Sequence, residues 1–459
     1  MKLALVTRRF PPECCGVGDY TERLAESWQR QGHEVIVFVA SQGKDGSQKS
    51  EVRSQKKTDA EEPKEGIRVV RIGLEGWRDI ASAVKAIREA RPDAVQIEYS
   101  NYGWSRWGFA FWMNALVLAL RRAGLPVTIA LHEFPLEFRQ HPLLAGVSLV
   151  QWAHFALLVL GANEVLTNTP ERVRILRRWF PWQRDTIRYR PNSSHIPVAT
   201  CGADERAGLR AAHAAGTELV VATFGMFHST KHYEGVIEAA GMLCDEAPTA
   251  LWLLGDEQQT LSSYLEKLHA AVRANHLDGT VWWSGHLEAE EVSAALQAVD
   301  IFVLPQPDGH LTRSSAFMAA AAHGLAVIAV RNAENQADFE HGENVWLVEA
   351  SRAELFSAAL RRLAGDAALR ARLGSNLRAL YEREFAWAVA AAPRGSAVNG
   401  AEVESAEIVK PQMNGESRNS KIGKSKDKEP NAETQRTQRS AENGRREIPC
   451  PDTKHRDSE

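Results

Sequence analysis

The sequence predicts an α/β protein with two doubly wound parallel-sheet domains, each Rossmann-like, that face each other across a cleft. Short runs rich in valine and isoleucine alternate with longer amphipathic segments in both halves of the chain. This alternation is typical of parallel strands joined by helices. The pattern is interrupted at Pro191–Gly208, where turn formers and small polar residues replace it, and then starts again. Two such domains are therefore expected, one on each side of this join.

Twelve apolar runs are the candidate strands. Those before the join are KLALVT, EVIVFVA, IRVVRIG, DAVQIEY, PVTIALH and EVLTN, and those after it are ELVVATFG, TALWLLGD, TVWWSG, DIFVLP, LAVIAV and ENVWLV. Segments such as TERLAESWQRQG, DIASAVKAIREA, YEGVIEAAGMLCDE and EEVSAALQAV are the helices between them. Ligands of open parallel sheets bind beyond the carboxyl ends of the strands, so the loops that follow strands are the places to look for chemistry.

Domain boundaries follow from the same pattern. We expect a first domain at residues 1–196, a second at 197–375, and a helix at 376–389 that can cross back to the first domain. The remaining residues, 390–459, are polar, charged and repetitive, which predicts a disordered tail. A charged insertion at Ser41–Glu65 predicts a loop between two strands.

Composition excludes several classes of function. The 459 residues carry a net charge of −3, so no basic bias points to nucleic acid as a partner. The five cysteines have neither the density of a disulfide scaffold nor metal-site spacing, which fits a reducing cytoplasm. The sequence MKLALVT is expected to be a first strand rather than an export signal. With no Asp-x-Asp pair and no His/Cys cluster, neither a metal nor a cofactor is predicted.

Two loops stand out by their residue types. In CGVGDYT, Gly16 and Gly18 lack the third glycine of a dinucleotide fingerprint, which disfavours a nicotinamide enzyme. The loop is either a plain turn or a bare backbone that can approach a phosphate or a sugar. In FGMFHSTKHYEG, Lys231 opens a helix after a strand, where it opposes the helix dipole. That makes it a better anion ligand than a structural residue.

Three further loops place small or anion-binding groups after strands of the second half. They are LLGDEQQ with Gly255 and Asp256, WWSGHLEAEEV with Ser284 and Gly285, and DGHLTRSS with Asp308, Gly309, Arg313, Ser314 and Ser315. In the last loop a free helix N-terminus and an arginine could bind an anion. The alternative is that Thr312 or Ser314 caps the helix and Arg313 is a solvated side chain.

The chain resembles the family 4 glycosyltransferases of the GT-B fold, in order, over residues 1–387. The matching segments are CGVGDYTERLAESWQRQGHEVIVF, ALHEFP, PNSSHIP, FGMFHSTKHYEGVIEA, WLLGDEQ, VWWSGHLEAEEVSAALQAVDIFVLP and MAAAAHGLAVIAVRNAENQADFEHGENVWLVE. The resemblance implies transfer of a sugar from a nucleotide-sugar donor with retention of configuration. It also implies that the first domain holds the acceptor and the second the donor.

The resemblance also implies roles for individual residues. Lys231, Arg313 and the Ser314–Ser315 amides would stabilise the departing nucleoside diphosphate, and His132 in ALHEFP would orient the donor sugar; a strand-end histidine without a chemical role is the alternative. The donor-binding residues would be Gly16, Gly18, Gly255, Asp256, Ser284, Gly285, Asp308, Gly309, Ser314 and Ser315.

The chain departs from the family at three positions. The two carboxylates of the usual Glu-x7-Glu motif are replaced by Leu311 and Ala319, and an arginine of the family is replaced by Met226. The substituted loop resembles a bacterial subset in which Asp, Gly and then Ser/Thr-Arg occupy this place. A degenerate member that binds nucleotide-sugar or glycan without turnover is therefore the alternative function, and a nucleotide-sugar epimerase of the same fold is a third.

The acceptor cannot be identified from the sequence, and a glycan, a lipid-linked sugar or a small molecule would each fit, as in polysaccharide biosynthesis. The aromatic stretch SRWGFAFWMN, Ser105–Asn114, is interpreted as core and cleft wall. The alternative is a patch that docks on a membrane with help from Arg121 and Arg122. A cytoplasmic enzyme is expected, with a peripheral position at the inner membrane face as the alternative.

Overall fold

The computed structural model describes residues 1–13, 15–41, 67–135, 145–244, 246–257, 262–332 and 338–391. These ranges hold two sheets in which every pair of neighbouring strands runs parallel. The insertion expected at 41–65 lies outside the described residues from position 42 onward, and the tail expected at 390–459 does so from position 392.

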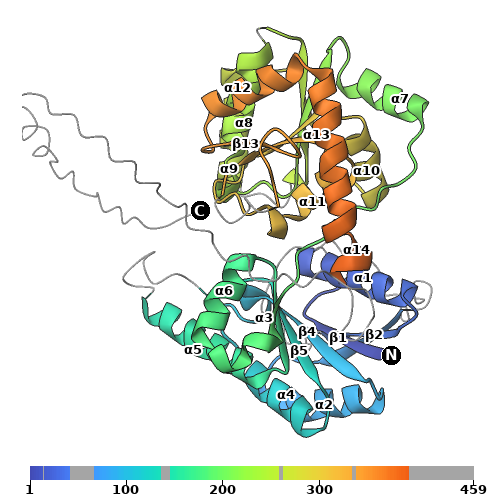
Figure 1. Cartoon of the computed structure of the whole chain (residues 1–459), viewed down its shortest axis with the longest axis vertical. Helices are drawn as coiled ribbons and strands as arrows, with labels where there is room; N and C mark the ends of the chain where they lie inside the picture. The colour runs from blue at the N-terminus through green and yellow to red at the C-terminus, as the bar shows by residue number, and fades with distance from the viewer. Residues whose placement is uncertain are drawn as a thin grey trace, which may run out of the picture. The chain divides into compact units, whose positions relative to one another are not determined.

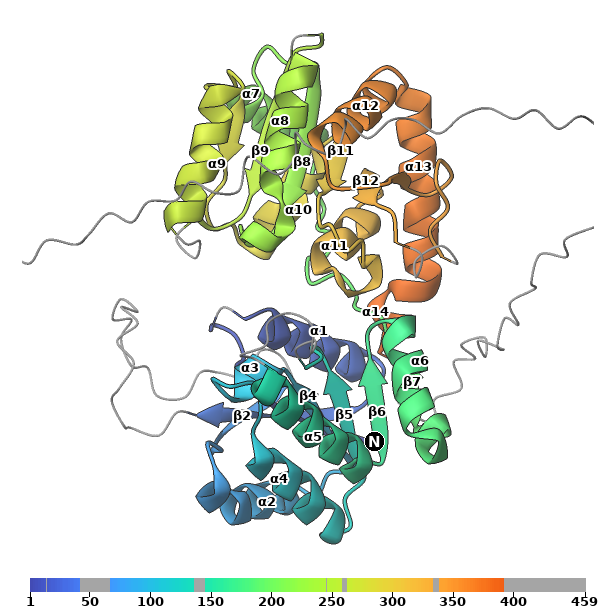
Figure 2. The same ribbon diagram turned by 90° about the vertical axis from the view of Figure 1, so that its left-hand side faces the viewer.

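The first sheet has the strand order β3-β2-β1-β4-β5-β6-β7 within the described ranges (Figure 1). Its strands are β1 Lys2–Thr7, β2 Glu34–Ser41, β3 Arg68–Gly73, β4 Ala94–Tyr99, β5 Val127–Leu131, β6 Glu164–Thr167 and β7 Ile187–Tyr189. Its helices are α1 Gly16–Arg30, α2 Ile80–Glu89, α3 Asn101–Trp104, α4 Phe111–Arg122, α5 Ala145–Gly161 and α6 Pro170–Trp179. Helix α1 covers one face of the sheet, while α2, α4 and α5 cover the other (Figure 2).

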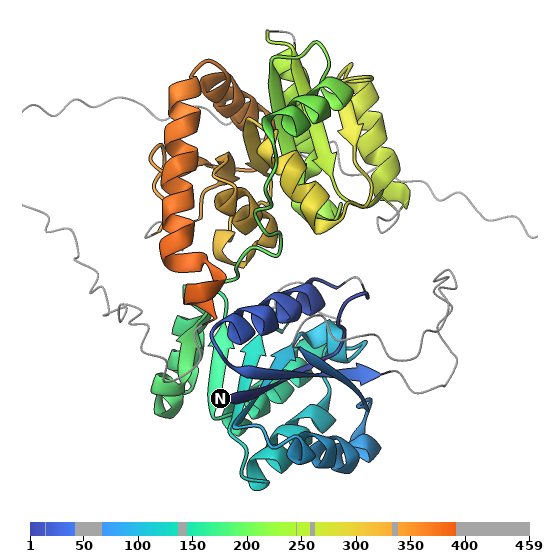
Figure 3. The same cartoon turned by 90° about the vertical axis from the view of Figure 1, so that its right-hand side faces the viewer.

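The second sheet repeats this arrangement with the order β10-β9-β8-β11-β12-β13. Its strands are β8 Leu219–Phe224, β9 Thr249–Leu254, β10 Val281–Trp283, β11 Ile301–Leu304, β12 Ala326–Val330 and β13 Trp346–Val348. Its helices are α7 Ala203–His213, α8 Tyr233–Cys244, α9 Ser262–Ala274, α10 Ala289–Gln297, α11 Ser315–Ala322, α12 Ala353–Ala364 and α13 Ala367–Leu380. Helices α8, α9 and α12 pack on one face and α10 and α11 on the other, while the long helix α13 contributes side chains to both clusters (Figure 3).

Both sheets change direction of winding at one place. In the first sheet β1 lies between β2 and β4, and in the second β8 lies between β9 and β11. The loops that leave such a pair of neighbouring strands go to opposite faces and open a crevice at the carboxyl edge. The loops after β1 and β4, and those after β8 and β11, are therefore the positions where this fold can bind a ligand.

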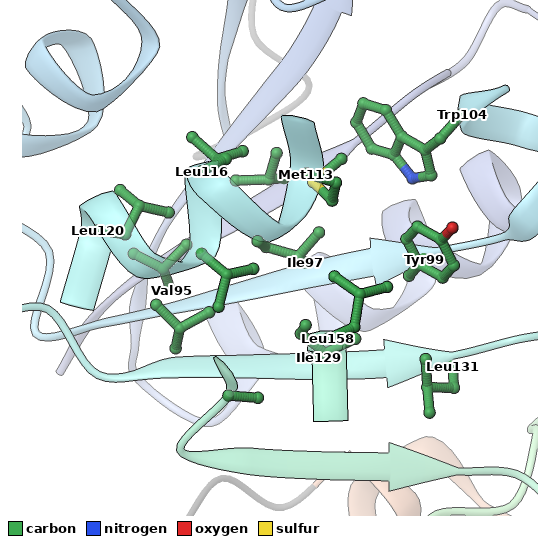
Figure 4. Close-up of a cluster of buried hydrophobic side chains, with 14 of the residues drawn as sticks. Val95, Ile97, Tyr99, Trp104, Met113, Leu116, Leu120, Ile129, Leu131 and Leu158 are labelled. Carbon is green, nitrogen blue, oxygen red and sulfur yellow. The ribbon is translucent and has the colours of Figure 1, made fainter. Parts of the chain in front are cut away.

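The core of the first sheet is built by alternate residues of its strands. Val95, Ile97 and Tyr99 of β4 point toward α4 and α5 and pack there with Met113 and Leu158 (Figure 4). Because side chains alternate along a strand, Gln96 and Glu98 must point to the opposite face, which α1 covers. Both are buried as well, so this strand carries two polar side chains inside the protein.

The end of the described chain returns to the first sheet. After α13, a π-helical turn at Tyr381–Phe385 leads to α14 Trp387–Ala390, which contacts α1. The indole Nε1 of Trp28 donates to the carbonyl oxygen of Ala391 at 2.6 Å, and that of Trp387 donates to the carbonyl of Ser194 at 2.6 Å. Helix α13 runs across the boundary expected at residue 375, and Ala390 and Ala391 are ordered parts of this contact rather than the start of a tail.

Candidate functional site

His132 follows β5 directly and is held from several sides. Its ring Nε2 lies 2.7 Å from Oε2 of Glu98, a carboxylate that is completely buried at the end of β4. Its backbone N–H donates to the carbonyl of Tyr99 at 2.9 Å, and the ring of Tyr20 from α1 meets its ring edge-on at 5.0 Å. Only 13% of the His132 side chain is exposed. The ring therefore has a fixed orientation at the carboxyl edge of the sheet.

The Glu98 carboxylate belongs to a chain of buried polar groups that the sequence analysis missed. Gln96 donates from Nε2 to Oε1 of Glu98, and Arg190 donates from Nη1 to Oε1 of Gln96 at 3.0 Å. Burial raises the pKa of Tyr20 to about 12, although the nearby charge of Arg190 opposes this shift. A signal for this network is present in AVQIEY, because a strand buried on both faces has no packing reason for polar residues at alternate positions.

His195, in the PNSSHIP segment, lies beside this group. Its ring is 6.1 Å from that of Tyr20, and its Nε2 is buried without a hydrogen-bond partner in the described part of the molecule. Burial, and to a lesser extent the neighbouring His132, lowers the pKa of His195 to about 4. The imidazole is therefore neutral at physiological pH.

A pocket opens beside His132 at the ends of β5, β6 and β7. It is lined by Tyr20, Ala130, Leu131, His132, Leu166, Thr167, Asn168, Arg190 and Asn192. The Oγ1 of Thr167 is buried and has no partner among the residues described. The pocket has room for about one water molecule.

The glycines of the first loop have different surroundings. A Cβ on Gly18 would lie 3.0 Å from the carbonyl oxygen of Arg9, whereas a Cβ on Gly16 would meet nothing within 4 Å. Gly18 is thus explained by packing of the loop that precedes α1. Within this loop and helix, the residue that contacts His132 is Tyr20, which the sequence analysis did not select.

Lys231 lies at the carboxyl end of β8, in a 3₁₀ turn at Ser229–Lys231. Its Nζ is 3.3 Å from the position that a Cβ on Gly225 would take, so the ammonium lies over the glycine that ends the strand. Burial lowers the pKa of Lys231. Across the described ranges its ammonium has neither a carboxylate nor a hydrogen-bond acceptor within reach. A desolvated cation without a partner is unfavourable, and an anionic ligand would remove that cost.

The loops after β9 and β10 meet the same glycine. Gly255 and Gly285 form an isolated antiparallel bridge, and the Gly255 N–H donates to Oγ of Ser284 at 3.1 Å. A Cβ on Gly255 would collide with the carbonyl oxygen of Gly225. Asp256, the next residue, is half-buried. The structure therefore brings the predicted residues Lys231, Gly255, Ser284 and Gly285 together around the end of β8.

The loop after β11 is a compact unit with its own partners. Arg313 forms an ion pair with Asp308, whose carbonyl oxygen accepts from the Asn332 amide. Gly309 has a φ of +59°, and a Cβ there would lie 2.6 Å from the carbonyl of Val330. The loop thus needs this glycine, and Arg313 has an acidic partner where the sequence interpretation left it free for a phosphate.

Two hydroxyl groups of this loop are also occupied. The Oγ of Ser314 accepts from the N–H of Phe317 and caps α11, and Thr312 donates to the carbonyl of Asn168 at 3.0 Å. This is the capping arrangement that the sequence left open as an alternative. Ser315 begins α11 with a half-buried side chain. The groups that remain for an anion at this end are the first backbone N–H groups of the helix and the Ser315 hydroxyl.

Hydrogen bonds between residues of the first sheet and residues of the second run through this loop. Asn192 donates from its backbone N–H to the carbonyl of Thr312 at 3.0 Å and from Nδ2 to that of Arg313 at 2.7 Å. Arg172 donates to the carbonyl of His132 at 3.2 Å, and burial together with the charge of Arg313 lowers the pKa of Arg172 to about 10. His132 and Arg313 are therefore neighbours in space although 181 positions separate them in the sequence.

The positions of the missing carboxylates are part of the core. Leu311 and Ala319 are both fully buried and pack with Phe317 in the apolar cluster on the α11 face of the second sheet. An ionised carboxylate at either place would be desolvated and unpaired. Met226, in place of the family arginine, has 53% of its surface exposed. The departures from the family pattern are thus accommodated by apolar packing at two of the three positions.

The described residues contain no group of three or more His, Cys, Asp and Glu side chains that could hold a metal ion. None of the helices in those same ranges has the length and apolarity that crossing a membrane requires.

Solved structures share this two-sheet fold. The chain matches sucrose-phosphate synthase from Thermosynechococcus elongatus with a TM-score of 0.63 at 18% identity, covering 85% of this chain and 96% of that one. It matches a glycosyltransferase from Rickettsia africae with a TM-score of 0.62 at 12% identity, covering 85% and 95%. Anabaena HepE, solved with UDP and glucose, gives a TM-score of 0.60 at 17% identity over 84% and 96%. The fold is therefore the predicted GT-B fold.

Sequence comparison identifies the family. Residues 15–193 match the glycosyl transferase 4-like domain, and residues 218–366 match the domain of the glycosyl transferases group 1. The chain belongs to the family 4 glycosyltransferases, as its motifs predicted. None of the curated proteins compared with it matches in sequence.

Proposed function

We propose that this glycosyltransferase moves a sugar from a nucleotide-sugar donor to an acceptor with retention of configuration. The observation that carries the proposal is Lys231, a half-buried residue whose ammonium lies at the winding reversal of the second sheet without an acidic partner in the described ranges. The leaving group of the reaction is a nucleoside diphosphate, whose negative charge grows in the transition state. A cation fixed in a desolvated place stabilises that charge without reorganising.

The other donor contacts follow from the same edge of the sheet. The first N–H groups of α11, the Ser315 hydroxyl and Arg313 would complete the diphosphate site, with Arg313 shared between Asp308 and the ligand. Gly255, Asp256, Ser284 and Gly285 would contact the nucleotide portion of the donor. Since these groups supply the positive charge, we expect turnover to continue in the presence of a chelator.

His132 would face the donor sugar from the first sheet. The Glu98 carboxylate occupies its Nε2, so Nδ1 is the ring nitrogen left for a sugar hydroxyl. HepE is solved with UDP-glucose, and a UDP-sugar is accordingly the first donor to test.

A donor panel tests the proposal directly. The purified protein is incubated with UDP-, GDP- and ADP-sugars, with and without candidate acceptors, and release of nucleoside diphosphate is followed. Release with one donor is expected, and NMR of the product should show the anomeric configuration of the donor. A product of inverted configuration would refute retention, and absence of release with every donor would refute catalysis.

Binding without turnover is the second candidate function. It is favoured by one observation, the burial of Leu311 and Ala319 at the places of both family carboxylates. Its signature would be a rise in melting temperature with nucleotide-sugar in a protein that releases no diphosphate from it. Release of nucleoside diphosphate from a donor that also raises the melting temperature would exclude this second function.

A further inference from the structure

Helix α5 buries its polar side chains and leaves several apolar side chains exposed. Ser148, Gln151 and His154 are all buried, with exposed fractions of 1% or less. Leu149 and Leu157, in contrast, have exposed fractions of 62% and 48%. Ala153 and Leu160 are exposed on the same side, and α5 contains no charged residue. A helix that faces water shows the opposite distribution.

The buried polar groups have a structural explanation. The Gln151 amide donates to the carbonyl of Trp107 at 2.8 Å, and the ring Nε2 of His154 lies 2.9 Å from the carbonyl of Ala110. These bonds satisfy two backbone carbonyl groups of the loop between α3 and α4. Burial lowers the pKa of His154 to about 4, so the ring is neutral and well suited to this position. The outward leucines, by comparison, pack on nothing that the structure describes.

Two tryptophans extend this surface. Trp179 at the end of α6 is 48% exposed and its ring lies 4.8 Å from that of Trp152 on α5. Trp182 is 69% exposed in the following turn, which is held against α5 by a hydrogen bond from Gln183 to the carbonyl of Val159. We call the set Leu149, Ala153, Leu157, Leu160, Trp179 and Trp182 the α5 face; α5, α4 and α6 are neighbours in Figures 1 and 2.

The margin of the α5 face is basic. Arg121 donates to the carbonyl of Gly161, the last residue of α5, at 2.8 Å, and Arg122 beside it is exposed. Arg178 and Arg184 are exposed next to Trp179 and Trp182, where Asp185 is the exposed acidic neighbour in the sequence. Arginines around an apolar strip with tryptophans at its edge match the layers of a lipid surface, which is anionic above and apolar below.

We propose that the α5 face docks on an anionic lipid bilayer, with α5 parallel to the membrane plane at the boundary between headgroups and acyl chains. Seventeen residues give a helix of about 25 Å, enough for a broad in-plane contact. A second copy of the chain is a poorer occupant, because a two-fold contact would bring the same arginines together. The proposal is independent of catalysis, since a binding protein could dock in the same way.

Vesicle co-sedimentation of the full chain tests the proposal. The wild-type protein should sediment with phosphatidylglycerol-containing vesicles, less with pure phosphatidylcholine, and less in high salt. Leu157→Glu should weaken binding at least tenfold, and Arg178→Ala and Arg184→Ala about fivefold each. Trp182→Ser should also weaken it, whereas Trp77→Ser, a change at a similarly exposed tryptophan of the first sheet, should not.

Three results would overturn the proposal. The first is wild-type protein that stays in the supernatant with anionic vesicles. The second is equal loss of binding in Trp77→Ser and Trp182→Ser, which would show that the site is not specific. The third is a dimer in light scattering that Leu157→Glu dissociates, which would make the α5 face an interface between copies. Because Leu157 is exposed, an unchanged melting temperature should confirm that the variant is folded.

Discussion

The two groups of candidate residues differ in how their charges are satisfied. In the first sheet His132 pairs with Glu98, and Gln96 and Arg190 complete a closed set of hydrogen bonds. In the second sheet the ammonium of Lys231 lies over Gly225 and has no counter-charge in the described ranges. A satisfied network holds its shape without ligand, whereas an unpaired, half-buried cation gains most when an anion arrives. We therefore expect the His132 site to orient the substrate and the Lys231 site to stabilise negative charge.

Lys231→Ala should have the largest effect. Removing a fixed cation from an anion site costs about 3–4 kcal/mol of transition-state stabilisation, a fall in kcat/KM of two to three orders of magnitude. The melting temperature without ligand should not fall, because the half-buried ammonium makes no ion pair in the described ranges that the substitution would remove. Lys267→Ala, which removes an exposed lysine paired with Glu234, is the control and should retain activity. A lower ligand-free melting temperature with normal nucleotide binding would contradict the assignment.

Arg313→Ala should be somewhat milder, because Asp308 already shares the guanidinium. We expect a loss of about 2–3 kcal/mol in kcat/KM and a smaller thermal shift with nucleoside diphosphate. Arg313→Lys should recover only part of the loss, since lysine lacks the planar fork. If Asp308→Asn lowers activity as much as Arg313→Ala does, the ion pair itself is what the reaction needs and the diphosphate contact is wrong.

Glu98→Gln tests the orientation side of the comparison. The amide can still accept from His132, but it loses the charge and competes as a donor, so we expect about a tenfold lower kcat/KM, mainly through kcat. Nitrogen-15 NMR of the imidazole should show the proton on Nε2 in the wild type. In a second variant, Glu98→Leu, which removes the acceptor, it should show a mixture of the two tautomers. Glu164→Gln, on the neighbouring strand β6, is the control. An unchanged tautomer with lost activity would mean that Glu98 acts in another way.

Gly255→Ala and Gly16→Ala test the smallest expected effect, a difference in stability between two glycines of the candidate site. A Cβ at position 255 meets the backbone of Gly225, and overpacking of this kind costs about 1–3 kcal/mol. At position 16 the added methyl meets nothing within 4 Å, so the free energy of unfolding should stay within about 0.5 kcal/mol. Chemical denaturation of both variants measures this, and equal stabilities would show that the β8, β9 and β10 loops are not packed as described.

The hydrophobic pattern of the sequence predicted most strands and helices correctly, but it did not predict the shortest strand or the exact ends of some elements. All twelve predicted strands are present, because parallel strands buried on both faces leave continuous apolar runs. Strand β7, three residues of IRY, was missed since such a run carries no period. The helix expected at 21–32 begins earlier, at Gly16, because the two glycines of its first turn do not look helical in the sequence. The join expected to reach Gly208 ends where α7 begins, at Ala203.

The candidate site was visible in part for a related reason. Lys231 and Arg313 could be selected because they lie in loops that follow strands and lead into helices, and His132 because its segment ALHEFP resembles the family. Their partners were harder to select: Glu98 lies 34 positions from His132, and the polar residues of AVQIEY indicate a buried network without showing which residues they contact. The capping role of Ser314 was one of two open alternatives until the Phe317 contact was known.

Properties that depend only on neighbours along the chain could be predicted from the amino-acid sequence. The alternation of strands and helices, the order of the family segments and the residue types after each strand are local properties, and they were enough for the GT-B fold and the glycosyltransferase family. Tertiary structure decided which charges are paired. Asp308 neutralises Arg313, Glu98 holds His132 and Lys231 has no partner in the described residues, because burial and distance through space set the energy of a charge and neither is encoded in any short stretch of the sequence.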